Sequence, residues 1–250
     1  MTPTDYSQAF NRTERLLGAE AMAALAGVKV IIFGVGGVGS WCAESLMRTG
    51  LRHLTLVDAD IVAVSNINRQ AMATSSTVGM PKAEAMAARL RDINPEAEIT
   101  AIQGLYTADT AEAFDLDSYD YIIDAIDSLA DKALLILNAT STRRRFFSSM
   151  GAALKSDPTR IGVAEFWKVS GCPLAAALRR RFKKSGNMPR RKFKCVYSPE
   201  LLENRPVADD TSGAMSFNKV AVNGALCQVT ATFGLTLASL VVNDIFSRLK

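Results

Sequence analysis

Cysteine and histidine are scarce in this sequence, and the shortage excludes whole classes of site. The four cysteines among 250 residues lie far apart and form no CxxC pair, so we expect neither a zinc ribbon nor a disulfide framework. The one histidine, His53, stands where we expect a helix to give way to a strand, at the sheet edge opposite to bound ligands. We interpret it as a surface residue. A Ser-His-Asp hydrolase and a histidine-ligated metal enzyme are therefore not expected.

Signals for export are also missing. The first residues, MTPTDYSQAFNR, lack the basic and then apolar pattern of a secretory leader, so we expect a cytoplasmic protein. A long apolar run extends from Gly224 to Phe246, close to the roughly 20 residues that a membrane span needs. Its regularly spaced Thr and Ser residues favour a buried carboxy-terminal helix, with membrane association as the alternative that is not favoured.

Apolar runs alternate with helical patterns along the first 150 residues. The predicted strands are residues 28–33, 54–58, 99–102, 119–125 and 145–150, and the predicted helices are residues 13–26, 41–50, 79–95 and 131–144. This alternation is typical of a doubly wound, mostly parallel α/β sheet. We predict a single domain over residues 1–250, with a nucleotide-binding part at about 10–150 and a less regular, substrate-binding part at about 151–250.

A glycine-rich loop, GVGGVGS at residues 34–40, joins the first predicted strand to a helix. Glycines at such a junction allow a tight turn and let helix N–H groups face phosphate; here they are Gly34, Gly36, Gly37 and Gly39. Asp58 ends the second strand, where dinucleotide-binding folds hold a ribose. The loop therefore predicts a nucleotide and is compatible with NAD or FAD as well as ATP.

Two cations follow in a polar loop over residues 59–78 and the next helix. Arg69 lies in SNINRQ, and Lys82 lies in the first helical turn, where a positive charge opposes the helix dipole. A bound anion would compensate that cost, so we predict that both side chains contact a triphosphate. An NAD-dependent oxidoreductase would leave them without a role, because the backbone holds most of its pyrophosphate.

An acidic pair lies at the end of another buried strand, in IIDAIDS. Asp124 closes the strand, and Asp127 follows at the edge of the sheet where open α/β folds bind ligands. A carboxylate beside a triphosphate is a natural Mg²⁺ ligand, so we predict that Asp127 holds Mg²⁺. The alternative is that Asp127 caps the helix that begins near Leu129.

The order and spacing of GVGGVGS, VDAD, SNINRQ, GMPKA and DAIDS resemble the ubiquitin-activating-enzyme-like superfamily, over about residues 10–150. Its bacterial members adenylate sulfur carriers in molybdopterin and thiamin synthesis. The resemblance implies ATP and Mg²⁺ and a homodimer in which Arg12, or alternatively Arg15, reaches the neighbouring subunit's site. It implies a catalytic set of Asp127, Arg69, Lys82 and Arg12 and a nucleotide-binding set of Gly34, Gly36, Gly37, Gly39, Ser40, Asp58, Asn66, Gln70 and Ser128.

The second half of the chain is strongly basic. Residues 1–142 carry 10 Lys/Arg and 18 Asp/Glu, a net charge of −8, whereas residues 143–250 carry 19 and 7, a net charge of +12. Nine basic residues and no acidic one lie in a tract over residues 179–194: Arg179, Arg180, Arg181, Lys183, Lys184, Arg190, Arg191, Lys192 and Lys194. We predict that this basic tract binds nucleic acid and that Phe182 and Phe193 stack a loop base. A solvated basic loop is the alternative.

Residues 156–186, KCVYSPE and VTATFGL resemble one branch of the superfamily, the tRNA threonylcarbamoyladenosine dehydratases. The resemblance implies ATP-dependent adenylation of the threonyl carboxylate of N6-threonylcarbamoyladenosine in tRNA, then cyclisation with loss of water. Adenylation of a ubiquitin-like sulfur carrier is the alternative, and it is disfavoured because zinc-binding cysteine pairs are missing. A non-catalytic tRNA-binding protein remains a third hypothesis.

The branch also raises two points about partners and cysteines. It leaves room for a sulfur-transfer protein as a partner. Its members often carry a cysteine where this chain has Lys219, and we interpret Cys227 as a structural residue rather than a nucleophile.

Overall fold

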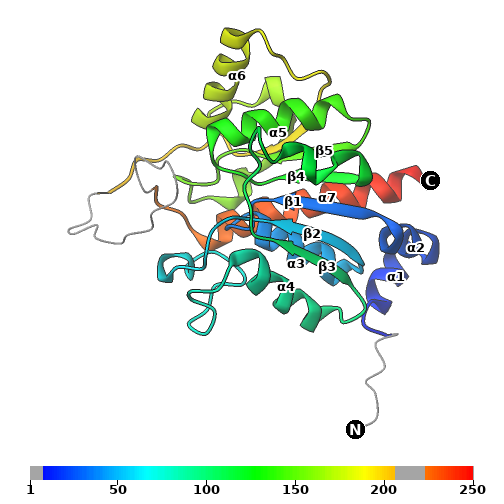
Figure 1. Ribbon diagram of the computed structural model, residues 1–250. Coiled ribbons are helices and arrows are strands. Elements are labelled where there is room, and N and C mark those ends of the chain that lie inside the picture. The colour runs from blue at the N-terminus through cyan, green and yellow to red at the C-terminus, as the bar shows by residue number, and fades with distance from the viewer. Residues whose placement is uncertain (1–7, 206–222, 250) are drawn as a thin grey trace.

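In the computed structural model, which describes residues 8–205 and 223–249, seven strands form one sheet between two layers of helices (Figure 1). The strand order is β3-β2-β1-β4-β5-β7-β6, and every pairing is parallel except the one between β6 and β7. The strands are β1 Lys29–Phe33, β2 His53–Val57, β3 Glu98–Ile102, β4 Tyr121–Asp124, β5 Arg145–Ser149, β6 Gly162–Glu165 and β7 Lys194–Tyr197. The predicted doubly wound, mostly parallel α/β fold is confirmed.

The two helical layers cover opposite faces of this sheet. The helices are α1 Asn11–Leu17, α2 Ala19–Gly27, α3 Gly39–Thr49, α4 Lys82–Ile93, α5 Leu129–Ser141, α6 Pro173–Ser185 and α7 Cys227–Arg248. Helices α5 and α6 lie on one face, and α3, α4 and α7 lie on the other (Figure 1). Strands β6 and β7 come from the second half of the chain and extend the sheet built by the first half.

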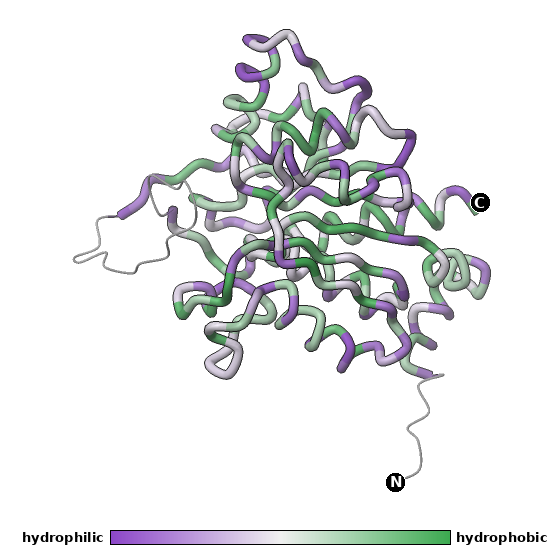
Figure 2. The backbone as a smooth tube through the Cα atoms, in the orientation of Figure 1, coloured by the Kyte–Doolittle hydropathy of each residue, from purple (hydrophilic) through white to green (hydrophobic). Residues whose placement is uncertain are grey.

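The run KVIIF shows why the strands are continuous apolar segments in the sequence. Val30 and Ile32 pack into the core beneath α3 and α7, whereas Ile31 and Phe33 pack into the core beneath α5. A parallel strand with helices on both faces has no solvent-facing side, so both alternating sets are apolar. Figure 2 shows the result, with hydrophobic residues concentrated in the central strands and hydrophilic residues around them.

One predicted helix is divided into two in the structure. The expected helix over residues 13–26 is two helices, α1 and α2, separated at Gly18 with φ 87° and ψ 157°. Glycine adopts that backbone conformation without the steric cost that a Cβ imposes. Helix α1 has no buried residue, and its Leu16 side chain is 79% exposed.

The carboxy-terminal helix α7 packs along α3, as predicted for a core helix, and buries one face. Close approach depends on Gly234, where a Cβ would lie 2.4 Å from the Val38 carbonyl oxygen. By length and composition alone α7 could also cross a membrane, and 44% of its most apolar window is buried. Its threonine and serine hydroxyls donate to carbonyl oxygens one turn back, as Thr232 does to Gln228 at 2.7 Å.

Candidate active site

Three loops meet at the carboxyl edge of the sheet. Strand β1 lies between β2 and β4, and Phe33 at its end is in register with both Val57 and Asp124. The loops that follow these strands carry the glycine motif, Asp58 and Asp127. Because parallel strands end at the same edge, the predicted groups are brought together as expected.

The glycine loop lies directly against the loop that follows β4. Gly34 has a φ of 87°, and a Cβ there would lie 2.7 Å from the carbonyl oxygen of Ala125. The first residue of α3, Gly39, is equally crowded, since a Cβ would lie 1.8 Å from the Gly34 carbonyl oxygen. Only glycine fits these two positions, which leaves the N-terminus of α3 open to a phosphate.

Asp58 fastens the glycine loop to the end of β2. Its carboxylate accepts hydrogen bonds from the backbone N–H of Val35 at 2.6 Å and of Asp60 at 2.9 Å. Burial raises the pKa of Asp58, while the positive charge of Lys82 acts in the opposite direction. Asp58 therefore has a structural role in addition to the ribose contact that remains a prediction.

Lys82 begins α4 and is buried, with 8% of its side chain exposed. Its Nζ forms an ion pair with the Asp60 carboxylate at 2.7 Å. The anion near the helix N-terminus is thus a carboxylate of the same chain. An ammonium has three donors, so the predicted contact with a phosphate is compatible with this pair.

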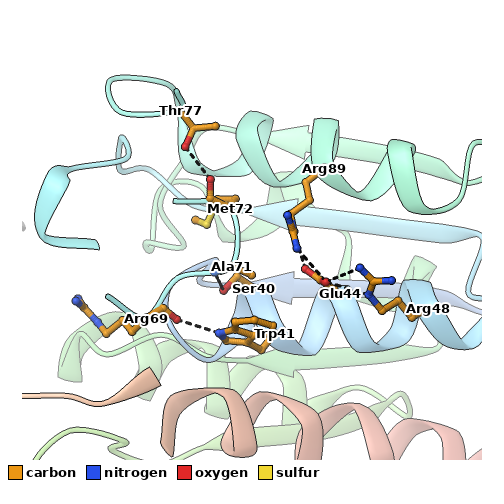
Figure 3. Close-up of polar contacts among 9 residues, drawn as sticks. All are labelled: Ser40, Trp41, Glu44, Arg48, Arg69, Ala71, Met72, Thr77 and Arg89. Carbon is orange, nitrogen blue, oxygen red and sulfur yellow. Dashed lines mark hydrogen bonds and ion pairs between the residues drawn. The ribbon is translucent and has the colours of Figure 1, made fainter. Parts of the chain in front are cut away.

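The long loop after β2 passes the start of α3 and is hydrogen-bonded to it (Figure 3). The Trp41 indole Nε1 donates to the Arg69 carbonyl oxygen at 2.9 Å, and the Ser40 hydroxyl accepts from the Ala71 backbone N–H at 3.1 Å. Ser40, predicted to bind nucleotide, therefore uses its oxygen to hold the loop. Asn66 is buried and accepts from the Ala63 backbone N–H at 3.0 Å, again within this loop.

Arg69 and Gln70 are the members of this loop that face the glycine motif. The Arg69 Cγ would lie 3.2 Å from a Cβ on Gly37, and the Gln70 Nε2 would lie 3.8 Å from one on Gly36. Burial lowers the pKa of Arg69, and the negative charge of Asp127 opposes that shift, which places the two side chains in one electrostatic environment. Gln70 is 5% exposed, and its Oε1 is buried with no hydrogen-bond partner among the described residues. An orphaned polar atom beside a glycine cradle fits a nucleotide ligand.

Asp127 is exposed in the short loop between β4 and α5. The N-cap of α5 is Ser128, so Asp127 stands before the helix rather than at its cap. Asp127 therefore lies at the ligand-binding edge of the sheet, in a loop that buried groups hold from below.

The buried ion pair that holds this loop was not predicted from the sequence. Lys132 and Asp124 are both fully buried and form an ion pair with Nζ and Oδ2 2.8 Å apart. Ser148 donates to Asp124 at 2.7 Å, and Lys132 also donates to the carbonyl oxygen of Ile126 at 2.8 Å. One sequence signal could have indicated this ion pair. Lys132 stands directly before the apolar helix pattern ALLILNA, and the strand before that helix ends in the carboxylate of Asp124.

A family model described as the ThiF family matches residues 10–245 of the chain, which is nearly its whole length. The chain belongs to the ThiF family. The tRNA threonylcarbamoyladenosine dehydratase of Escherichia coli is 40% identical over 247 residues, covering 94% of this chain and 92% of the relative. The Bacillus subtilis enzyme of the same name is 43% identical over 177 residues, covering 71% and 70%.

Solved structures agree with this assignment. The crystal structure of the Escherichia coli dehydratase in complex with ATP has a TM-score of 0.85 to this ThiF-family chain, at 36% identity over 100% of this chain and 98% of that one. The resemblance to the adenylating superfamily, and to its dehydratase branch, is therefore confirmed.

Arg12 does not lie at the site of its own chain. Arg12 is exposed on α1. Phe10, two residues before it, lies next to Gly50, just before β2, so this part of the chain is at the end of the sheet where the strands begin. His53, the first residue of β2, lies at the same edge, where its Nδ1 is 3.0 Å from a Glu98 carboxylate oxygen. The predicted contribution of Arg12 thus requires a second copy of the chain.

The basic tract divides into two groups. Arg179 donates to the carbonyl oxygens of Phe166 and Val169, and Arg191 donates to those of Ala139 and Arg144. The other seven are exposed: Arg180, Arg181, Lys183, Lys184, Arg190, Lys192 and Lys194.

Two aromatic predictions in this tract are wrong. Phe182 and Phe193 are 1% and 6% exposed and belong to the core under α5 and α6, so neither can stack an RNA base. Cys227 is the first residue of α7 and is partly exposed, whereas Lys219 lies outside the described residues.

Proposed function

We propose that this ThiF-family chain adenylates the threonyl carboxylate of N6-threonylcarbamoyladenosine in tRNA and that the product then cyclises with loss of water. The observation that carries the proposal is the meeting of the glycine loop, Arg69 and Asp127 at one sheet edge. A dehydratase relative that aligns with 94% of the chain, second half included, supports the tRNA substrate over a sulfur-carrier protein.

The reaction has two balanced steps. An oxygen of the substrate carboxylate attacks the α-phosphorus of ATP, and the bond to pyrophosphate breaks. A nitrogen or oxygen of the same substrate side chain then attacks the acyl carbon, loses its proton, and displaces AMP. Because both reacting atoms belong to one side chain, the second step is intramolecular and requires no nucleophilic residue from the protein.

The protein's contribution is placement and charge. The N-terminus of α3 behind Gly36 and Gly37 presents N–H groups to phosphate, and Arg69 and Lys82 offset the negative charge that grows on leaving pyrophosphate. Asp58, already bonded to the glycine loop, is the group proposed to meet the ribose. Gln70 supplies an amide beside the same glycines.

A Mg²⁺ ion fits this site as a companion of ATP. Among the described residues no group of three or more His, Cys, Asp or Glu side chains could hold a metal by itself. Mg²⁺ commonly takes one or two carboxylates and completes its shell with phosphate and water, so Asp127 would serve as its protein ligand. When bound, the ion would neutralise phosphate charge.

The partners follow from the charge and from the position of Arg12. The seven exposed residues of the basic tract form the proposed tRNA surface. The cytoplasm is the proposed location of the reaction. A homodimer would bring Arg12 of one copy to the carboxyl edge of the other. If the site is shared in this way, mixing the inactive Arg12→Ala and Asp127→Ala proteins should restore about a quarter of wild-type activity, because about half of the dimers are mixed and each mixed dimer has one intact site. No recovery of activity would contradict the shared site.

The test of the activity is pyrophosphate release from ATP with tRNA that carries threonylcarbamoyladenosine. We expect release by the wild type to need the modified tRNA and to fall by about 10²–10³-fold in Asp127→Ala. Asp109→Ala, which removes an exposed carboxylate elsewhere, is the matched control and should keep full activity. Release driven only by a carrier protein ending in Gly-Gly, or none with either substrate, would reject the proposal.

A further inference from the structure

A pocket lies beside the last strand of the sheet, away from the proposed nucleotide site. It is open, has a volume of about 370 Å³, and is lined by Val163, Ala164, Glu165, Lys192, Phe193 and Lys194. This edge pocket belongs to β6 and the start of β7, and β6 is the last strand of the sheet. Three strand spacings separate β6 from β4, whose loop carries Asp127, so the two strands are about 14 Å apart. Its volume falls within the roughly 300–1,000 Å³ of small-molecule sites.

The walls of the edge pocket combine apolar and basic character. Val163 is 42% exposed, and Phe193, which also lines the pocket, is buried. Lys192 and Lys194 are exposed and belong to the basic tract. A nucleic-acid base suits both the apolar and the basic walls, since its flat ring can cover Val163 while the two lysines contact phosphate groups of the backbone.

Glu165 adds a specific acceptor to this environment. It lies directly opposite Lys194 in the antiparallel pairing of β6 with β7. Its Oε2 accepts from the Trp167 backbone N–H at 3.2 Å, which orients the carboxylate. Its Oε1 is buried and has no hydrogen-bond partner in the part of the chain that the structure describes. A buried acceptor without a donor is costly, so a ligand that brings an N–H group would be stabilised there.

We propose that the edge pocket binds one unpaired base of the substrate tRNA, in the same loop as the modified adenosine, and that Glu165 accepts a hydrogen bond from the exocyclic amine of that base. The inference rests on the proposed function. Lys194 is level with Phe147 and Ile123 in the sheet, so Asp127 lies up to about 13 Å farther along the strands as well as about 14 Å across them. The combined distance of at most about 19 Å corresponds to about six stacked nucleotides at 3.4 Å each. Adenine, cytosine and guanine carry such an amine, whereas uracil presents only carbonyl oxygens at the matching positions, so the pocket selects against uracil.

The experiment measures the affinity of the full chain for stem-loop RNAs that contain threonylcarbamoyladenosine. Each neighbouring loop nucleotide is replaced in turn by uridine or by an abasic nucleotide. For the wild type we expect one position at which either replacement weakens binding about tenfold, the loss of one hydrogen bond to a charged group. In Glu165→Gln, the amide oxygen keeps the hydrogen bond from the Trp167 backbone N–H, and an NH2 donor replaces the Oε1 acceptor, so the preference for an amine-bearing base over uridine disappears.

Lys183→Ala is the control, because Lys183 is an exposed member of the basic tract outside the pocket. It should weaken binding of every stem-loop by the same factor, whereas Glu165→Gln acts at one loop position. Melting temperatures confirm that both variants are folded. If Glu165→Gln weakens all the stem-loops equally, or none, the edge pocket does not read a base. Failure of the proposed function is separate, since it appears as absence of pyrophosphate release by the wild type with any modified stem-loop.

Discussion

At the scale of single residues, the site depends on a charged pair that no ligand touches. Lys132 and Asp124 lie fully buried beneath the loop that presents Asp127, and Ser148 and the Ile126 carbonyl complete their hydrogen bonds. A pair of this kind contributes little net stability compared with apolar residues, but losing one partner leaves an unpaired buried charge. The pair therefore fixes the position of the loop more than it stabilises the fold.

Replacing Lys132 with methionine tests that role. We expect Lys132→Met to lower the free energy of unfolding by about 3–5 kcal/mol, because the Asp124 carboxylate would be left buried and uncompensated. Urea denaturation measures the change. The double variant Lys132→Met/Asp124→Asn should recover much of the loss, and a single variant as stable as wild type would show that the pair is dispensable.

At the scale of elements, the nucleotide loop is positioned by helices distant in sequence. Helix α7 packs on α3, and its Thr230 side chain would lie 3.2 Å from a Cβ on Gly37. On its other side α3 is tied to α4, since Glu44 of α3 accepts from Arg89 of α4 at 2.6 Å (Figure 3). The start of α3, where phosphate is proposed to bind, is thus held from both sides.

A methyl group at Gly234 should disturb this arrangement. Gly234→Ala places a Cβ 2.4 Å from the Val38 carbonyl oxygen, so α7 must move away from α3. We expect a loss of about 1–3 kcal/mol in stability together with weaker ATP binding.

Gly27→Ala is the matched control for that substitution. A Cβ at Gly27 meets nothing within 4 Å, so this change should be neutral or stabilising by about 0.4–1 kcal/mol. Denaturation curves and ATP titrations of the two variants decide the point. Equal behaviour of both proteins would mean that α7 does not position the glycine loop.

At the scale of the whole molecule, charge separates the two halves of the chain. The net −8 of residues 1–142 belongs to the part that builds the nucleotide site, and the net +12 of residues 143–250 belongs to the part with the basic tract. The hydrophilic end of α6 projects from the body of the protein in Figure 2. We expect this distribution to present a cationic surface to the proposed tRNA substrate, whereas the proposed ATP site lies in the acidic half of the chain.

Salt dependence measures this surface. For the double variant Arg180→Ala/Lys184→Ala we expect weaker tRNA binding and a plot of log affinity against log salt that is shallower by about one for each phosphate that the variant no longer neutralises. Affinity for ATP should stay unchanged. Arg52→Ala is the control, because Arg52 lies directly before β2, outside the basic tract, where it pairs with Glu96 at 2.7 Å. An unchanged slope would remove these two residues from the tRNA surface.

The sequence by itself determined the first five strands of the sheet, the family and the loops that meet at the site, but it did not predict β6 and β7. Apolar runs such as KVIIF and the glycine motif act through near neighbours in the chain, and parallel topology then brings the carboxyl ends of strands together. The break at Gly18 was missed because a single glycine is tolerated within a helical pattern and only its backbone conformation ends the helix.

Only the tertiary structure decided which polar residues face a ligand and which face the protein. Lys132 pairs with Asp124, Lys82 with Asp60, and Arg179 and Arg191 turn toward backbone carbonyls. Phe182 and Phe193, which stand among charges in the sequence, are core residues. Composition and spacing indicate which interactions a side chain can make. Its actual partner depends on which strand or helix packs against it, and the packing of the whole chain decides that.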